Sequence, residues 1–347
     1  MSNLIIAYLL VLCGGLTRNK YVHQFLILFL AYLFSTRNEN VPDTDNYMFH
    51  YENALVELMD VTGDIGMVAL NYLFNNILDL PFSVFLFVLT FFLMEICYYA
   101  TKRIVLSQHI GIVFLLFMSF YGFFYFGIII RNGVALTLCY LALSFLIRSE
   151  KWGKLKFVGV MSLALLFHKS SILLFPLLFL VNMKMTYNRA VIWFLLSLLM
   201  IGLGSVSMVS SSLKLIEGVD SYSYDRYSSY TEDSTTKLYT ATFIMDFFIT
   251  IVSICGQRIV KNDVRQMYEF VLKVILLGFS MYCLLWQLPG ISRIAGMYFF
   301  MSSLVFYIFI YWSKYKVSNA LKNSLTLIVS LSYFISLVII QKYILYY

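Results

Sequence analysis

Long apolar runs dominate the chain, and short polar segments separate them. A helix needs about 20 apolar residues to cross the ~30 Å hydrocarbon core of a bilayer, because each residue adds about 1.5 Å. Many runs approach this length and lack the alternation of a membrane strand. The runs cover residues 3–16, 22–35, 82–100, 109–126, 127–147, 157–181, 190–209, 241–256, 268–287, 291–313 and 324–341. The pattern predicts an all-α polytopic membrane protein with about 10–12 transmembrane helices.

Composition agrees with this pattern. Hydrophobic residues make up 61% of the 347 residues and charged residues 12%, whereas a soluble domain has about 45–50% apolar and about 25% charged residues. The excess apolar surface must therefore face lipid. No linker or internal repeat divides the chain, so we predict a single membrane domain, 1–347, with two longer polar segments, 36–80 and 210–240, on its outer face.

The net charge of +7 comes mainly from lysines and arginines in short loops between the runs. Such a distribution is typical of cytoplasmic loops and argues against nucleic acid as a partner. With the loop of Arg18 and Lys20 inside, the segment 36–80 lies outside, and it carries eight acidic residues and one basic residue, Arg37. The five cysteines all lie in apolar runs, so we expect no external disulfide framework.

The run 157–181 is long enough for one crossing, but a single crossing would place eight downstream basic residues outside. Two short helices, 157–167 and 172–181, would return the chain to the cytoplasm and keep those residues inside. Each leg reaches only ~17 Å, so the tip, His168-Lys169-Ser170-Ser171, would lie near the middle of the bilayer. Polar backbone at that depth needs surrounding protein or a water-filled cavity. The sequence therefore predicts a re-entrant hairpin beside a cavity.

The two outer segments have different characters. The first contains an amphipathic stretch, Met67–Leu78, whose apolar residues fall largely on one face, as in helices that lie along a membrane surface. The second holds five tyrosines among Ser, Thr and Asp: Tyr222, Tyr224, Tyr227, Tyr230 and Tyr239. These tyrosines suit stacking on sugar rings and an aromatic interface belt equally well.

No soluble-enzyme signature is present, because the chain has no Gly-rich phosphate loop, no paired His/Cys metal spacing and no G-x-S-x-G. Charged residues within or beside a membrane domain are costly and usually face a cavity or a partner. The candidates are the polar residues at the predicted outer ends of spans: Arg37, Asp43, Asp45, Arg131, His168, Asp246 and Arg293.

Four motifs, in order, resemble the EpsG-like family of Wzy-type exopolysaccharide and O-antigen polymerases. Residues 37–51, with Arg37, the Asp43-Thr44 pair, Tyr47 and Tyr51, are similar to the family's first outer loop. Ile130-Arg131-Asn132-Gly133-Val134-Ala135 is similar to its Arg-Gln-x-x-Ala motif, and Phe167-His168-Lys169-Ser170-Ser171 to its Phe-His-x-Ser motif. Ser292-Arg293-Ile294 with Tyr298 is similar to its late Arg-Ile…Tyr. Pro42 and Asn132 stand where the family usually has Gly and Gln, and neither change removes a charge.

The resemblance implies a glycosyltransferase, for which a GT-C-like architecture is suitable. Such a polymerase joins polyprenyl-diphosphate-linked oligosaccharide units at the outer face of the bacterial cytoplasmic membrane, together with a flippase and a chain-length regulator. The implied catalytic residues are Asp43, His168 and Arg131, with either Asp43 or His168 as the base. The implied ligands of the substrate or its diphosphate are Arg37, Arg293, Lys169 and Tyr47. No cofactor is predicted, although a divalent cation between Asp43 and Asp45 is an open alternative.

Each candidate also has a structural interpretation. Arg131 and Arg293 would serve as interfacial anchors or in ion pairs, for example with Asp246, and Arg37 would anchor its span. Asp43 would cap a turn after Pro42, and His168 would be a packed, hydrogen-bonded residue.

Three other functions stay open. The first is a transporter or flippase of lipid-linked oligosaccharide, although such proteins often have interrupted helices in matching halves, and this chain has one interrupted pair. The second is an O-antigen-ligase-like enzyme with the same donor and another acceptor. The third is a membrane acyltransferase that modifies sugars.

Overall fold

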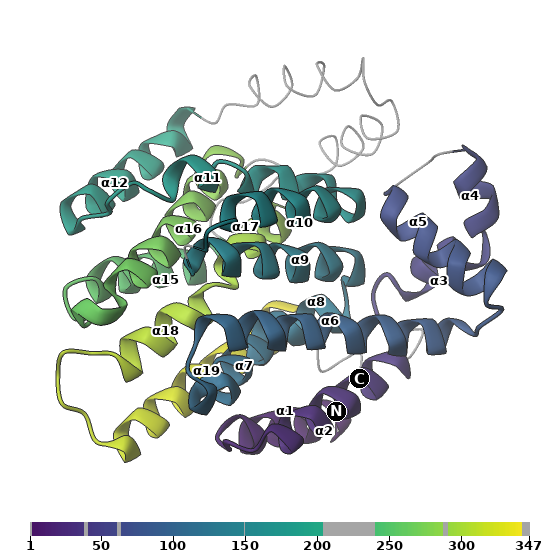
Figure 1. The fold of residues 1–347 in the computed structure, drawn as a ribbon, viewed down its shortest axis with the longest axis horizontal. Helices are drawn as coiled ribbons and strands as arrows, with labels where there is room; N and C mark the ends of the chain where they lie inside the picture. Colours follow the sequence, from purple (N-terminus) through teal and green to yellow (C-terminus); the bar gives the residue numbers. More distant parts are fainter. Residues whose placement is uncertain are drawn as a thin grey trace. The chain divides into compact units, whose positions relative to one another are not determined.

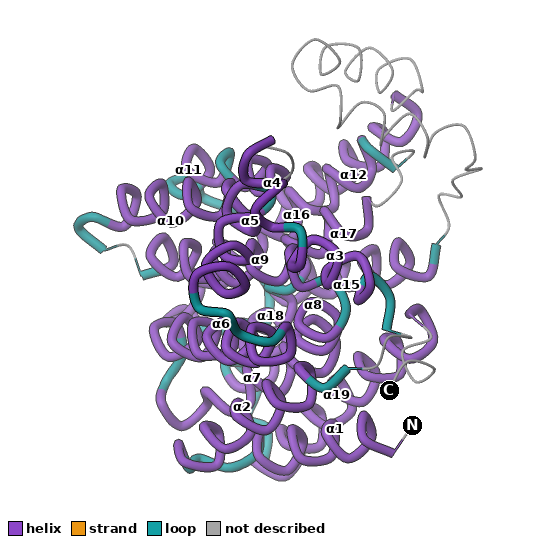
Figure 2. Tube along the Cα trace, turned by 90° about the vertical axis from the view of Figure 1, so that its right-hand side faces the viewer, coloured by secondary structure: helices purple, strands orange, loops and turns teal. Residues whose placement is uncertain are grey.

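Helices form throughout the part of the chain that the structure describes. The computed structural model describes residues 2–37, 41–60, 64–148, 150–203, 240–286 and 291–341. Within these ranges no strand forms, and one isolated bridge joins Val260 to Ser313; Figure 2 shows helix and loop alone. The predicted all-α fold is confirmed. The segment 210–240, which was predicted to lie on the outer face and holds the five tyrosines, lies outside the described residues except for Thr240.

Among the described residues, six helices are long and apolar enough to cross a membrane. They are Phe82–Ile104, Ser107–Gly127, Ile130–Ile147, Asn262–Leu284, Ile294–Tyr311 and Asn319–Ile339. Shorter apolar helices accompany them at Leu4–Gly15, Lys20–Ser35, Lys169–Leu180, Tyr187–Gly202 and Ala241–Gly256. The chain is a multi-pass membrane protein.

The chain divides into two compact units. Unit 1 comprises Met1–Val181 and Lys316–Tyr347, and unit 2 comprises Asn182–Tyr315. The α-helices of unit 1 are α1 Ser2–Gly15, α2 Lys20–Ser35, α3 Thr44–Glu52, α4 Ala54–Asp60, α5 Ile65–Tyr72, α6 Phe82–Ile104, α7 Ile110–Phe117, α8 Phe123–Gly127, α9 Ile130–Ile147, α10 Gly153–Phe167, α11 Leu177–Leu180 and α19 Asn319–Gln341. Those of unit 2 are α12 Tyr187–Leu203, α15 Ala241–Gly256, α16 Arg265–Leu284, α17 Ile291–Phe299 and α18 Ser302–Tyr311.

The centre of unit 1 is the stretch Ser107–Gly127, in which a π-helical turn joins α7 to α8. Its apolar window is entirely buried, as expected for a helix that is hydrophobic on all sides, and α1, α6, α9 and α19 pack around it. Ser119 Oγ lies 2.7 Å from Ser330 Oγ, which lies 2.9 Å from the hydroxyl of Tyr8. These buried hydroxyls satisfy one another and join α1 and α19 to the centre.

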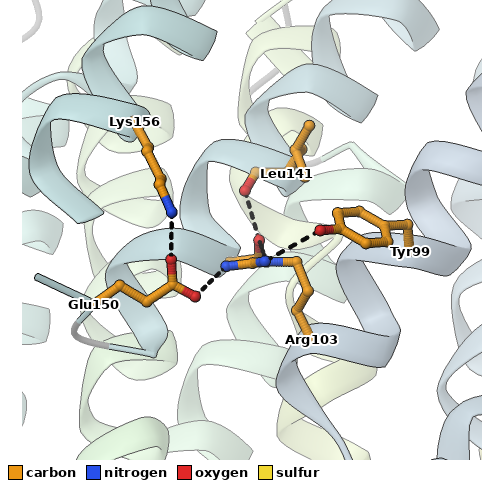
Figure 3. A network of polar contacts seen from close by, with 6 residues as sticks. Tyr99, Arg103, Leu141, Glu150 and Lys156 are labelled. Carbon is orange, nitrogen blue, oxygen red and sulfur yellow. Dashed lines mark hydrogen bonds and ion pairs between the residues drawn. The ribbon is translucent and has the colours of Figure 1, made fainter. Parts of the chain in front are cut away.

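In unit 1, α9 packs between α6 and α10 (Figure 1). Where α6 and α9 end, side chains centred on Arg103 form what we call the Arg103 cluster (Figure 3): Tyr99, Arg103, Ser144, Glu150 and Lys156. The Nε of Arg103 donates to Ser144 Oγ (3.1 Å), Nη1 donates to the hydroxyl of Tyr99 (3.3 Å), and Nη2 pairs with Glu150. The Nζ of Lys156 lies 3.0 Å from the second oxygen of Glu150. The cluster thus joins α6, α9 and α10 at one end.

The predicted hairpin is present, although its second leg differs from the prediction. Helix α10 ends at Phe167, and His168 has extended backbone (φ −160°, ψ 111°). The chain then reverses, because the ring of Phe175 lies 6.1 Å from that of Phe157 near the start of α10. Instead of one helix over 172–181, the return leg is a 3₁₀ helix, Lys169–Leu174, followed by α11. Pro176 separates the two, since proline has no N–H to continue a preceding helix. The cavity beside this hairpin stays a prediction.

The helices α3, α4 and α5 lie together near the amino terminus of α6 (Figure 1). Tyr51 of α3 stacks on Phe85 of α6 with 5.0 Å between ring centres, and its hydroxyl donates to the carbonyl of Leu80 at 2.5 Å. These contacts hold the segment against the start of α6.

The amphipathic stretch Met67–Leu78 is helical as predicted, in α5 and a π-helical turn, Leu73–Ile77. Leu73 and Ile77 of the predicted apolar face are exposed, while the buried residues of α5 are Gly66, Met67, Val68 and Asn71. The position of the exposed face at a membrane surface stays a prediction.

Unit 2 is arranged around α16, against which α12, α15, α17 and α18 pack. Phe194 of α12 and Phe243 of α15 both stack on Phe279 of α16, at 5.2 Å and 6.0 Å between ring centres. The polar Lys273 is buried in α16 and donates to the carbonyl of Met183 (2.9 Å). An aromatic core therefore holds this unit together.

Candidate functional site

The candidate site lies in unit 1 at the amino end of α9. The chain leaves helical geometry between α8 and α9, and Ile129 has φ −103° and ψ 66°. A Cβ on Gly133 would lie only 2.6 Å from the carbonyl oxygen of Tyr125, so glycine allows α9 to approach α8 this closely. This packing places Arg131 in the first turn of α9, where N–H groups without intrahelical partners and the helix dipole favour negative charge.

Arg131 forms an ion pair with Asp64, a residue that the sequence analysis did not single out. Its Nη1 lies 3.1 Å from Oδ2 of Asp64, and the side chains are 29% and 11% exposed. The Nε of Arg131 is buried and has no hydrogen-bond partner within the described ranges. Nε and Nη2 form the edge of a guanidinium that binds two oxygens side by side. Asp64 therefore engages Arg131 without using this edge.

Tyr47 of α3 connects Arg131 to Arg37. The backbone N–H of Arg131 donates to the Tyr47 hydroxyl at 3.5 Å, and the guanidinium of Arg37 lies 5.5 Å from the centre of the Tyr47 ring. The Nη1 of Arg37 also donates to the carbonyls of Gly127 (3.2 Å) and Ile128 (3.5 Å). Burial raises the pKa of Tyr47, so its phenol stays protonated at neutral pH. Three sequence candidates thus meet, and Arg37 additionally caps the end of α8.

Asp43 has a left-handed backbone conformation (φ 64°, ψ 0°) just before α3. This conformation costs roughly 1–2 kcal/mol for residues other than glycine, although Asp adopts it more readily than most. The side chain does not cap α3, so the predicted capping interpretation finds no hydrogen bond to support it. Asp43 and Asp45 are both exposed, and the charge of Asp43 adds to the rise in the pKa of Tyr47.

The hairpin tip also lies close to the segment that carries Asp64, because α5 packs on the end of α10. A Cβ on Gly66 would lie 2.9 Å from the carbonyl oxygen of Leu166 and 3.0 Å from the ring of Phe167, so the start of α5 packs on the last turn of α10. His168 follows directly and is half-buried, whereas Lys169 is exposed. The structure therefore brings the third motif next to the segment that carries Asp64.

The fourth motif lies in unit 2. Arg293 belongs to α17, but its side chain is outside what the structure describes. Asp246 of α15 is 1% exposed, and its Oδ2 has no hydrogen-bond partner among the described residues. Roles for Arg293 and Asp246 stay predictions.

The site combines two guanidinium groups, a protonated phenol and the positive end of a helix, with exposed carboxylates close by. Within the described ranges, no three His, Cys, Asp or Glu side chains gather as a metal-binding group. Whether Asp43 acts alone or shares a cation with Asp45 stays open. The arrangement can hold an anionic group with bidentate geometry and offer a carboxylate as proton acceptor.

The fold defines a multi-pass helical membrane protein, and its candidate site presents a partly buried arginine at a helix end. The chain matches the EpsG family over residues 20–347. It belongs to the EpsG family, which is linked to exopolysaccharide biosynthesis. The match spans all four motifs and confirms the resemblance. Neither curated proteins nor solved structures give a significant match.

Proposed function

We propose that this protein is a polymerase that joins polyprenyl-diphosphate-linked oligosaccharide units into a surface polysaccharide. The reaction would take place at the outer face of the bacterial cytoplasmic membrane. Membership of the EpsG family supports the biosynthetic process. The observation that carries the proposal is Arg131, whose Nη1 is paired with Asp64 while its buried Nε has no hydrogen-bond partner in the described structure. An oxyanion with two adjacent oxygens would complete this group.

In the proposed reaction, the hydroxyl oxygen of one unit attacks the anomeric carbon of the growing chain. A new glycosidic C–O bond forms as the C–O bond to the diphosphate breaks, and the polyprenyl diphosphate leaves with the electron pair. Arg131 would stabilise the charge that develops on the leaving group. Arg37 and Lys169 would bind the diphosphate or the sugars, and the phenolic O–H of Tyr47 would donate a hydrogen bond to an oxygen of the substrate. Arg293 belongs to unit 2, and its predicted role in substrate binding stays a prediction.

The proton of the attacking hydroxyl needs a base. Asp43 is exposed, its side chain is not used to cap α3, and its charge acts on Tyr47. His168 lies beside the contact between α10 and α5. We favour Asp43 because it is grouped with Tyr47, which bonds to Arg131, and we keep His168 as the alternative.

One observation favours a second candidate, a flippase for the same lipid-linked units. Asp246 is a buried carboxyl group in an apolar helix, and an ionisable residue at such a position often belongs to a proton or ion pathway in transporters. The two functions differ in one activity that can be measured. A polymerase lengthens units that are already at the outer face, whereas a flippase does not.

The proposal is tested with the full-length protein in a strain that lacks its own polymerase but keeps its flippase. The wild type should convert single lipid-linked units into long chains. Arg131→Ala should leave single-unit products at normal protein levels, because one oxyanion donor contributes roughly 10²–10³ in rate, or about 2.7–4 kcal/mol. Arg148→Ala, an exposed arginine at the other end of α9, is the matched control and should behave as wild type.

Several outcomes would contradict the proposal. Unchanged chain lengths in Arg131→Ala would remove the diphosphate role of this residue. Failure of the wild-type protein in liposomes to lengthen units supplied from outside would favour the flippase. Transfer of whole chains to a different acceptor, or of acyl groups to sugars, would instead identify a ligase or an acyltransferase.

A further inference from the structure

Asp64 stands outside the four family motifs, and its side chain is used in an unusual way. It occupies the N-cap position of α5 (φ −89°, ψ 103°), and its backbone carbonyl accepts from the N–H groups of Met67 (2.9 Å) and Val68 (3.1 Å). An aspartate at this position ordinarily bonds to an N–H of its own helix through the side chain. Here the side chain makes no such bond. Its Oδ2 lies 3.1 Å from Nη1 of Arg131 instead.

The position of Asp64 is held by packing as well as by charge. Gly66, two residues further on, approaches the carbonyl of Leu166 so closely that a Cβ would lie 2.9 Å from its oxygen. The start of α5 is therefore held against α10, and Asp64 is only 11% exposed. A carboxylate held in this way can orient a long side chain that would otherwise sample several rotamers.

The contact also determines which part of Arg131 is available. Asp64 pairs with Nη1 of Arg131, and Nε on the opposite edge is buried and has no hydrogen-bond partner in the described ranges. A guanidinium binds a phosphate most specifically through two parallel N–H···O bonds. The Nε–Nη2 edge is suited to such a pair of bonds because Asp64 does not occupy it.

We propose that Asp64 is a positioning residue, which holds Nη1 of Arg131 so that the Nε–Nη2 edge receives two oxygens of the lipid-linked diphosphate. This inference rests on the proposed function and extends it to a residue outside the family motifs. Asp64 touches neither substrate nor reacting atoms and acts through Arg131. The Asp64 carboxylate also repels an incoming anion, and Arg37 and the amino end of α9 oppose this repulsion.

The test uses the purified full-length protein in lipid nanodiscs, with polymerisation rate and binding of undecaprenyl diphosphate as separate measurements. Asp64→Asn should lower the rate about 10- to 100-fold, since a misplacement of about 1 Å can cost up to 10²-fold, and should weaken binding about 10-fold. Asp64→Glu, which keeps the carboxylate, should recover part of both. In an Arg131→Ala background, Asp64→Asn should cause no further loss, because residues that act as a unit are not additive.

A charge swap separates positioning from simple structural support. Asp64→Arg combined with Arg131→Asp restores an ion pair but moves the guanidinium away from α9. We expect this double variant to fold with a normal melting temperature and to stay inactive. Recovery of activity in the swap would overturn the proposal, because the ion pair alone would then be what matters. Faster polymerisation or tighter binding in Asp64→Asn would also overturn it, by making Asp64 a competitor of the ligand.

The two measurements distinguish this inference from the proposed function. If the wild type binds undecaprenyl diphosphate and the binding losses are non-additive, the positioning role stands even when no chains form, and only the polymerase assignment fails. If the wild type polymerises and the two losses multiply, the positioning role alone fails. If the wild type neither binds nor polymerises, both are wrong.

Discussion

Two arginines at opposite ends of α9 form ion pairs in unit 1, and they differ in how completely each guanidinium is used. In the Arg103 cluster, all three nitrogens of Arg103 have acceptors, and the group also lies 4.3 Å from the centre of the Phe145 ring. At the amino end, Arg131 pairs with Asp64 through Nη1, while its buried Nε has no partner within the described ranges.

The difference indicates that Arg103 supports the fold, whereas Arg131 keeps donors that can bind a ligand. A buried donor without a partner costs about 1–3 kcal/mol, so a purely structural arginine would be expected to satisfy its nitrogens, as Arg103 does. Tyr47 and Arg37 gather at the incomplete arginine, while Glu150 and Lys156 complete the other. Changes at the amino end should therefore alter activity, and changes in the Arg103 cluster should alter stability.

The largest effect is expected at Asp43. Asp43→Asn keeps the size of the side chain, and asparagine also adopts left-handed backbone readily, so the variant removes little except the charge. It should abolish polymerisation in purified enzyme, with an unchanged melting temperature, while Asp45→Asn should be nearly silent and chelator should have no effect. Equal loss in both variants, with recovery on addition of magnesium, manganese or calcium to chelated enzyme, would replace the lone base with a shared cation.

The opposite behaviour is expected at Arg103. Arg103→Ala leaves Ser144 and Tyr99 without a donor and removes one of two cations from Glu150, so it should lower the free energy of unfolding by about 1–3 kcal/mol. The polymerisation rate per folded molecule should stay that of the wild type. Thermal melting in detergent measures the first quantity, and Lys102→Ala, an exposed neighbour, serves as the control. If Arg103→Ala lowered the polymerisation rate as much as Arg131→Ala does, without loss of stability, the proposed difference between the two ends of α9 would be wrong.

The smallest effect is a pH dependence of the Arg103 cluster. The hydrogen bond from Lys156, together with Arg103, lowers the pKa of Glu150. A carboxylate with a lowered folded-state pKa contributes stability above its ordinary pKa of about 4.3, and this contribution is lost as the pH falls through the folded-state value. Glu150→Gln should therefore melt slightly below the wild type at pH 7, and the gap should close under acidic conditions. Because the Glu150 side chain is 27% exposed, the gap should be small; a gap that persists at low pH would refute the ionic explanation.

Hydropathy alone predicted most of the helices, and the matches are close. The apolar run 241–256 coincides with α15, and 82–100 lies within α6. The break at His168 was also predicted, because the distribution of basic residues required the chain to turn back there. The return leg was predicted less well, since Pro176 and local packing produce a 3₁₀ helix in place of the expected α-helix.

The candidate site was predicted in part. The motifs identified Arg37, Tyr47 and Arg131, which the structure brings together, but they contained no signal for Asp64. Asp64 is one of eight acidic residues in the segment 36–80. Nothing in their spacing indicates which one meets an arginine 67 positions later, because that contact depends on how α5 packs against α10 and how α9 packs against α8.

The sequence by itself therefore determined the class of protein, the helices and the chemical groups available. Exposing apolar side chains to water or backbone polar groups to lipid is costly, and this cost can be judged for each segment separately. Only the tertiary structure decided which groups meet. It left Nε of Arg131 without a hydrogen-bond partner among the described residues and surrounded Arg103 with acceptors. The physical reason is that ion pairs and hydrogen bonds act over about 3 Å, and separation along the chain does not specify distance in space.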